Sequence, residues 1–194
     1  MQGEQLSEAR ERVLRVAEQI FIERGYTAVT MRDIAEALSI RQASLYHHIP
    51  GGKEQLFLEV LDRLMQRHKT QIEESLDRYG PDLRGQLLGV AQYLLDQPPI
   101  NISRLFRSDL PALGSEKSAE LAHDLAHALF KPLDHAMRAA YERGEIRMVN
   151  TFVAAVTFLA AIESLHEVHR YTSVPRAALA ADLIDVTLDG LRRR

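Results

Sequence analysis

The chain has 194 residues, of which 46% are hydrophobic and 26% are charged, and its formal net charge at pH 7 is −3. This balance is typical of a globular protein of one or two domains. The absence of cysteine excludes disulfide bonds and thiolate zinc sites. Gly and Pro occur in a few clusters, and the long segments between them are rich in Ala, Leu, Glu and Arg, which indicates an all-α fold.

The chain begins with two predicted helices. We expect the first over residues 7–24, from Ser7, a favoured N-cap residue, to Gly25, which suits a left-handed C-terminal position. The second begins after Thr30, which caps it while Asp33 at the third helical position reaches back, as in a capping box.

A turn at residues 39–41 leads to a third short helix, expected over residues 42–48, with Leu45 and Ile49 on its apolar side. Helices this short are marginal by themselves, so they must pack on the first helix to persist. Residues 50–52, Pro-Gly-Gly, then break the chain.

This break divides the chain into two expected domains, residues 1–52 and residues 53–194. The second should contain six longer helices, which makes about nine in all. Pro132 should kink or split one of them, and Asn150 should cap another. The six expected ranges are 53–79, 81–97, 100–109, 115–143, 151–171 and 175–190.

The third helix has the composition of one that reads the major groove of DNA, because small or polar side chains occupy its N-terminal turn. Arg can bond guanine and Gln adenine in a bidentate manner, and Ala can approach a thymine methyl group. Longer side chains can donate hydrogen bonds to phosphates and so fix the register. The candidate DNA-binding residues are Thr30, Arg41, Gln42, Ala43, Ser44, Tyr46, His47 and Lys53.

Charge does not add to this prediction, since residues 1–53 carry seven basic and seven acidic side chains. The prediction rests on the pattern, and it implies modest non-specific affinity for DNA.

The pattern resembles the TetR (tetracycline-repressor-like) family of regulators over about residues 7–57. The residues that carry the resemblance are TMRDIAEAL at 30–38 and ASLYHHIPGGKEQL at 43–56. The resemblance implies an all-helical homodimer without a cofactor or catalytic residues. Its three N-terminal helices would bind a palindromic operator in double-stranded DNA, and its C-terminal helices would hold an inducer pocket and the dimer interface.

The resemblance also implies roles for single residues. Tyr46 and His47 match a phosphate-contacting pair, and Lys53 matches a further phosphate ligand. Thr30 matches a capping residue, and Arg41, Gln42 and Ala43 match variable base-reading positions. The sequence departs from the family pattern at Ser39, where Gly is frequent, at Arg41, where Ser or Thr is usual, and at Ile49, where an aromatic residue is frequent.

The apolar faces of the later helices predict a cavity for a small-molecule effector of unidentified chemistry. Movement of the helix that begins at Lys53 would couple this cavity to DNA binding. The candidate lining residues are Met65, Tyr93, Phe106, His123, His127, Phe130, Phe158, Glu163 and His166.

Two other interpretations stay open. A helical metal-binding protein or enzyme could use His123 with His127 and His166 with His169, whose spacings of four and three place each pair on one helix face. The sequence contains no HExxH signature and no phosphate-binding glycine loop. The chain could also be a helical adaptor that binds protein.

The last two predicted helices, residues 151–171 and 175–190, are rich in Ala, and small side chains allow close packing. We therefore expect a homodimer through them. The apolar stretch at 152–162 is too short to span a membrane, and the N-terminus lacks a signal pattern. These observations predict a cytoplasmic protein.

Overall fold

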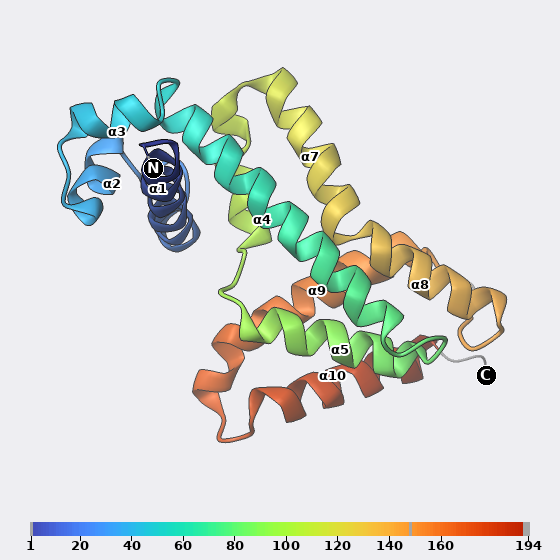
Figure 1. Ribbon diagram of the computed structural model, residues 1–194. Helices are drawn as coiled ribbons and strands as arrows, with labels where there is room; N and C mark the ends of the chain where they lie inside the picture. Colours follow the sequence, from blue (N-terminus) through green and yellow to red (C-terminus); the bar gives the residue numbers. More distant parts are fainter. Residues whose placement is uncertain (1, 148, 192–194) are drawn as a thin grey trace. The chain divides into compact units, whose positions relative to one another are not determined.

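In the computed structural model of the chain, the backbone is described for residues 2–147 and 149–191, and side chains for the same residues except 2–7 and 115. Every regular element within these ranges is helical, as predicted (Figure 1). The chain forms two compact units. The first unit contains Met1–Met65 and Asn101–Leu121, and the second contains Gln66–Ile100 and Ala122–Arg194.

The first unit begins with three helices and the start of a fourth, which are coloured blue to cyan in Figure 1. Its segment 101–121 adds a short helix, a π-helical turn, a 3-10 turn and the start of α7. The elements are α1 (Gln2–Arg24), α2 (Met31–Leu38), α3 (Gln42–His48), α4 (Gly52–Asp77), α6 (Ile102–Arg104), η1 (Leu105–Asp109), η2 (Pro111–Leu113) and α7 (Ser115–Leu129).

The second unit contains the ends of α4 and α7 and four further α-helices. Contacts between α8 and α9 and between α5 and α10 dominate this unit, and the latter pair lies side by side in Figure 1. The remaining elements are α5 (Leu83–Asp96), α8 (Lys131–Glu142), α9 (Thr151–Val168), η3 (His169–Tyr171) and α10 (Arg176–Leu191).

The compact units do not follow the break at residues 50–52, because the division falls inside α4 and because residues 101–121 join the first unit. The functional boundary between residues 52 and 53 stays a prediction, since compactness alone does not define a functional domain.

Several predicted helix boundaries are confirmed. Thr30 and Asp33 form the capping box, and Asn150 accepts a hydrogen bond from the backbone N–H of Val153 at 3.0 Å. Pro132 splits the predicted helix at residues 115–143 into α7 and α8 around Phe130. Proline has no N–H to bond the carbonyl four residues earlier, and its ring clashes with that carbonyl.

Two predicted helix starts are wrong. α1 begins at Gln2, so Ser7 lies inside the helix, and its side chain lies outside the described residues. α5 begins at Leu83, with Asp82 rather than Pro81 at its start, and the Asp82 carbonyl accepts the first helical hydrogen bond from Gln86 N at 2.9 Å.

The turn between α2 and α3 depends on one unusual backbone conformation. Ser39 has φ 56° and ψ 40°, in the left-handed region. In this conformation its N–H bonds the carbonyl of Glu36, and the next N–H, of Ile40, bonds the carbonyl of Ala35, both at 3.0 Å. These bonds satisfy carbonyls at the end of α2 and redirect the chain into α3.

Replacement of Ser39 by Gly should therefore stabilise the protein. Glycine adopts positive φ without steric cost, and the gain exceeds the extra backbone entropy it loses on folding, so the free energy of unfolding should rise by about 0.5–1 kcal/mol. Chemical denaturation of wild type and Ser39→Gly measures this change. Ser39→Ala keeps the strain and is the matched control, and equal stability of all three proteins would contradict the prediction.

Candidate nucleic-acid interface

The short helix α3 is held by one face and presents the other to solvent. Leu45 within it and Ile49 directly after it are fully buried. In contrast, Arg41, Gln42, Ala43 and Ser44 at its N-terminal turn are exposed, and so are Tyr46 and His47. Burial at two positions four residues apart thus orients six of the eight candidate DNA-binding residues outward.

The N-terminal turn of α3 can make new contacts. Arg41 occupies the N-cap position with extended backbone (φ −73°, ψ 144°), and its side chain makes no capping hydrogen bond. Its carbonyl accepts from Ser44 N at 2.9 Å, so the backbone alone begins the helix. The Arg41 and Gln42 side chains therefore have the reach and the donors that base recognition needs.

Thr30 is engaged in the capping box of α2. Its hydroxyl accepts from Asp33 N at 3.2 Å and donates to Asp33 Oδ2 at 2.5 Å, and its own N–H donates to Asp33 Oδ2 at 2.7 Å. These bonds stabilise the carboxylate and lower the pKa of Asp33 below its usual value. The main local contribution of Thr30 is thus to fix the start of α2.

Lys53, on the first turn of α4, has a defined partner. Its Nζ donates to the carbonyl oxygen of Tyr26 at 3.0 Å and lies 4.2 Å from the centroid of the Tyr26 ring, a cation–π contact. The side chain is half-buried, unlike those at the N-terminal turn of α3. The Tyr26 ring packs against Phe21 and Phe57, with centroids 6.3 Å and 4.7 Å away.

Tyr46 is 41% exposed and lies beside the start of α4, where a Cβ on Gly52 would come within 3.5 Å of its ring. His47 and His48 pack edge to face, with ring centroids 5.8 Å apart. Tyr46 and Lys53 therefore flank the same junction between α3 and α4, where a phosphate could accept from both.

Residues 101–109 also belong to this unit, which the sequence did not indicate. Asp109 is buried, and its Oδ1 accepts a hydrogen bond from Tyr26 N at 2.9 Å. The Arg104 guanidinium donates to the carbonyls of Phe21, Ile22 and Glu23 at the end of α1. No local sequence signal marks these contacts, because they join residues about eighty positions apart.

The candidate effector residues fall into both compact units. Met65 and Phe106 belong to the first, and the other seven belong to the second. Met65, Phe130 and Phe158 are buried, and Tyr93, Phe106, Glu163 and His166 are half-buried. Glu163 accepts from Ile100 N at 2.9 Å, and Phe130 packs edge to face on Phe152 at 5.9 Å.

His123 and His127 are exposed on α7, with ring centroids 4.6 Å apart. Partial desolvation and the nearby Lys131 lower the pKa of His127. Desolvation and Arg176 lower the pKa of His166. Among the described residues, no three His, Cys, Asp or Glu side chains come together as a metal site would require.

His68, which the sequence did not single out, is the most buried titratable group near these residues. It is 2% exposed on α4, and its Nδ1 lies 2.9 Å from the hydroxyl of Tyr93 on α5. Burial lowers the pKa of His68 to about 4, with a smaller contribution from Arg67. At neutral pH this side chain is therefore an uncharged hydrogen-bonding group inside an apolar core.

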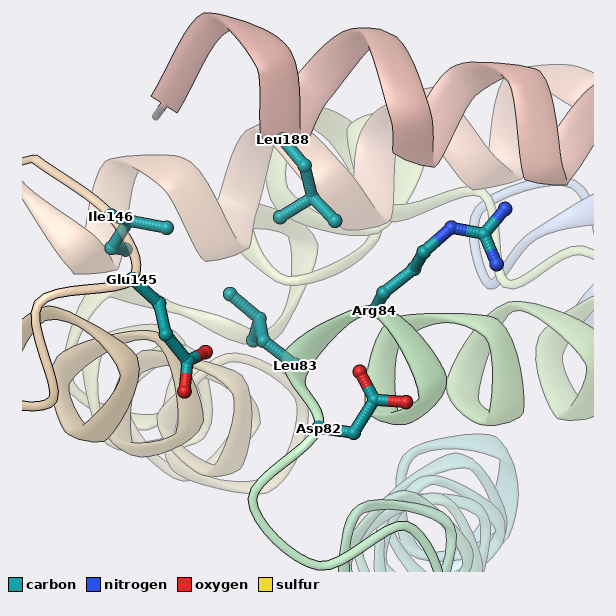
Figure 2. Close-up of a pocket in the computed structure, with 6 residues that line it drawn as sticks. All are labelled: Asp82, Leu83, Arg84, Glu145, Ile146 and Leu188. Carbon is teal, nitrogen blue, oxygen red and sulfur yellow. The ribbon is translucent and has the colours of Figure 1, made fainter. Parts of the chain in front are cut away.

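Described residues of the second unit line several pockets. One of about 160 Å³ is lined by residues from the start of α5, the loop after α8 and the end of α10; Leu83, Ile146 and Leu188 point toward one another in it (Figure 2). A second, of about 430 Å³, lies between α5 and α10, and a third, of about 390 Å³, lies beside the start of α9. None of the nine candidate effector residues lines these three pockets.

α9 with its 3-10 extension, Thr151–Tyr171, is 21 residues long and apolar enough to cross a membrane by length and composition. The apolar stretch at 152–162 lies within this helix. The helix packs on α5, α8 and α10, and its buried side chains are Ala155, Phe158, Leu159, Ile162 and Leu165.

A capped helix, a tight left-handed turn and a short exposed second helix together define a helix-turn-helix protein. Residues 13–60 match the model of the family described as bacterial regulatory proteins, tetR family. These residues of the first unit therefore carry the helix-turn-helix domain of the TetR family. The family is one of transcription regulators, so the interpretation as an enzyme is not favoured.

The relatives agree with this assignment. The chain is 35% identical over 127 residues to the HTH-type transcriptional repressor Rv3405c of Mycobacterium tuberculosis (strain ATCC 25618 / H37Rv). The match covers 60% of this chain and 66% of that protein, slightly less than two thirds of its length.

Solved structures agree over more of the chain. PfmR from Thermus thermophilus, a TetR family transcriptional regulator, superposes with a TM-score of 0.68 at 26% identity, over 94% of this chain and all of the other. AibR, in a complex with isovaleryl coenzyme A and operator DNA, superposes with a TM-score of 0.72 at 23% identity, over 91% of this chain and 96% of the other. The AibR likeness is one of fold.

The His68 environment predicts acid sensitivity. The unfolded chain takes up a proton at His68 near pH 6.5, whereas the folded protein resists protonation until about pH 4. Protonation between these values favours the unfolded state, so the free energy of unfolding should fall by about 3 kcal/mol as the pH drops from 6.5 to 4. Urea denaturation across this range measures the loss.

His68→Leu should remove this component of the pH dependence. Ser75→Ala, at another buried position on α4, is the control that should lower stability without changing the pH dependence. If wild type and His68→Leu lose stability equally over this range, His68 is not the responsible group.

Proposed function

We propose that the protein is a transcription repressor that binds a palindromic operator as a homodimer and leaves it when a small-molecule effector binds its C-terminal helices. The observation that carries this proposal is the arrangement of α3, whose exposed N-terminal turn lies opposite two fully buried side chains. The match of residues 13–60 to the TetR family model supports the same function.

In this proposal, Arg41, Gln42, Ala43 and Ser44 contact base edges, and Tyr46, His47 and Lys53 contact phosphates. Exposure of the first four and the donors of the last three support this division. Thr30 acts at the N-terminus of α2, where a phosphate is also favoured by the helix dipole.

The proposed dimer forms through α9 and α10. Val153, Thr157, Ala160 and Ser164 are exposed at spacings of three and four on one side of α9, opposite its buried side. On α10, Val186 is 73% exposed. Apolar and small residues along an exposed helix face allow close approach of a second copy, which a palindromic operator requires.

The effector site is proposed for the second unit, with Tyr93, His123, His127, Phe130, Phe158, Glu163 and His166 as candidate contacts. The half-buried polar groups among them could orient a ligand against the apolar residues. α4 is continuous from Gly52 to Asp77, so it connects Lys53 to the second unit along one helix. An effector that favours another position of α4 would change DNA affinity. We place the protein in the cytoplasm, where its operator would lie.

Substitutions in α3 and α4 should separate base contacts from phosphate contacts. Gln42→Ala should weaken the free energy of binding to the selected duplex by about 1–3 kcal/mol and relax the preference for one base at the position that Gln42 contacts. Lys53→Gln should weaken binding to all sequences and reduce the dependence of log K on log salt by about one per lost phosphate contact. Both are measured by fluorescence anisotropy on a duplex that the wild type selects from random-sequence DNA.

Gln92→Ala, exposed on α5, is the control and should leave binding unchanged. The proposed function fails if the wild type selects no duplex, or if Gln42→Ala and Lys53→Gln bind the selected duplex as tightly as the wild type does.

Ala160→Arg should disrupt the dimer, because it places a long charged side chain on the close-packed face of α9. Light scattering after size exclusion should report a dimer for the wild type and a monomer for the variant. Ala119→Arg, at an exposed position on α7, should remain dimeric. A monomeric wild type, or a dimeric Ala160→Arg protein, would show that this interface is wrong.

A further inference from the structure

We propose that Arg104 and Asp109 are positioning residues for DNA binding, because they hold Tyr26 and, through it, the ammonium group of Lys53. This inference rests on the proposed function and deepens it, since it adds residues that follow the helix-turn-helix by about fifty positions. All of the contacts that carry it lie within the first unit.

The π-helical turn η1 brings the two residues to one side. Leu110 N bonds the carbonyl of Leu105 at 2.9 Å, five residues back, so the turn is wider than an α-helical turn. In an α-helix, residues five apart point about 140° away from each other. Here Arg104 Nε and Asp109 Oδ2 are 3.5 Å apart as an ion pair.

Arg104 is attached to the end of α1. Its Nη2 donates to Ile22 O at 2.5 Å and to Phe21 O at 3.2 Å, and its Nη1 donates to Glu23 O at 3.3 Å. Carbonyls at a helix C-terminus have no partners within the helix, and their dipole favours a cation. Arg104 therefore bonds the carbonyls of Ile22 and Glu23 at the open end of the helix, and it adds a second donor to the carbonyl of Phe21, which also accepts from Gly25 N at 2.8 Å.

Gly25 permits a close approach at the same place. This residue has φ +80°, and a Cβ there would lie 2.9 Å from Arg104 Nε and 3.0 Å from Asp109 Oδ1. Only glycine fits this position without a shift of the charged pair. The absence of a side chain lets Asp109, which is 3% exposed, reach Tyr26 N at 2.9 Å.

Tyr26 links this charged pair to Lys53. Asp109 fixes the backbone of Tyr26, and the carbonyl and ring of Tyr26 fix the Lys53 ammonium. An ammonium group has three donors, and Tyr26 takes one, so two can serve a phosphate. An ion pair between Lys117 and Glu54 ties the same 101–121 segment to the first turn of α4.

The test is a double-mutant cycle on the duplex that the wild type selects from random-sequence DNA. Asp109→Asn should weaken binding about three- to tenfold at low salt and flatten the salt dependence, as Lys53→Gln does. The double variant Asp109→Asn/Lys53→Gln should bind no more weakly than Lys53→Gln alone, because both substitutions remove the same phosphate contact.

Arg104→Gln is the second variant, to be used if circular dichroism shows that Asp109→Asn does not fold. The Arg104 side chain is 25% exposed, so water can bond the carbonyls that lose the guanidinium. Arg107→Gln removes the same charge from an exposed position in η1 and is the matched control. Because salt screens distant exposed charges, this variant should keep the wild-type affinity and salt dependence.

The outcomes separate this inference from the proposed function. Selection of no duplex by the wild type overturns both. If the duplex is bound but the losses from Asp109→Asn and Lys53→Gln multiply, or if Asp109→Asn keeps the wild-type salt dependence, Asp109 acts only on stability and the positioning role is overturned.

Discussion

The arrangement of the interface depends on the burial of Leu45 and Ile49. A seven-residue helix has no appreciable stability of its own in water, so α3 persists only because these two side chains are packed against the rest of the first unit. The same burial decides which residues face outward. The capping box at Thr30 and the left-handed turn at Ser39 then fix where α3 begins. Packing thus sets the orientation of the interface, and the polar residues set its chemistry.

The features that the sequence predicts well are local. The capping box at Thr30, the cap at Asn150 and the split at Pro132 each follow from hydrogen bonds or steric limits within a few residues. The start of α1 is less predictable, since Ser7 is an acceptable helix residue as well as a good cap. The second helix of the interface, with its buried Leu45, was also predictable, because apolar spacing and short loops leave few other arrangements.

The features that the sequence does not predict are those that join distant positions. The bond from Tyr26 N to Asp109 spans 83 residues, and the π-helical turn that directs Asp109 has no known local signature in this segment. The pairing of His68 with Tyr93 is also not predictable, because the sequence of an amphipathic helix does not show whether a histidine on it is buried. For the same reason the candidate effector residues could be chosen by type but not by mutual position.

The contact between Lys53 and Tyr26 has a consequence for the entropy cost of the proposed DNA binding. A free lysine side chain loses up to about 2 kcal/mol of rotamer entropy when it is immobilised. Since Tyr26 already confines the Lys53 side chain in the unbound protein, much of this loss occurs during folding, and the proposed phosphate contact would cost less side-chain entropy. A protein whose N-terminal segment has balanced charge gains little from long-range attraction. Preorganisation of its few cations is one way for it to bind tightly without becoming a general polyanion binder.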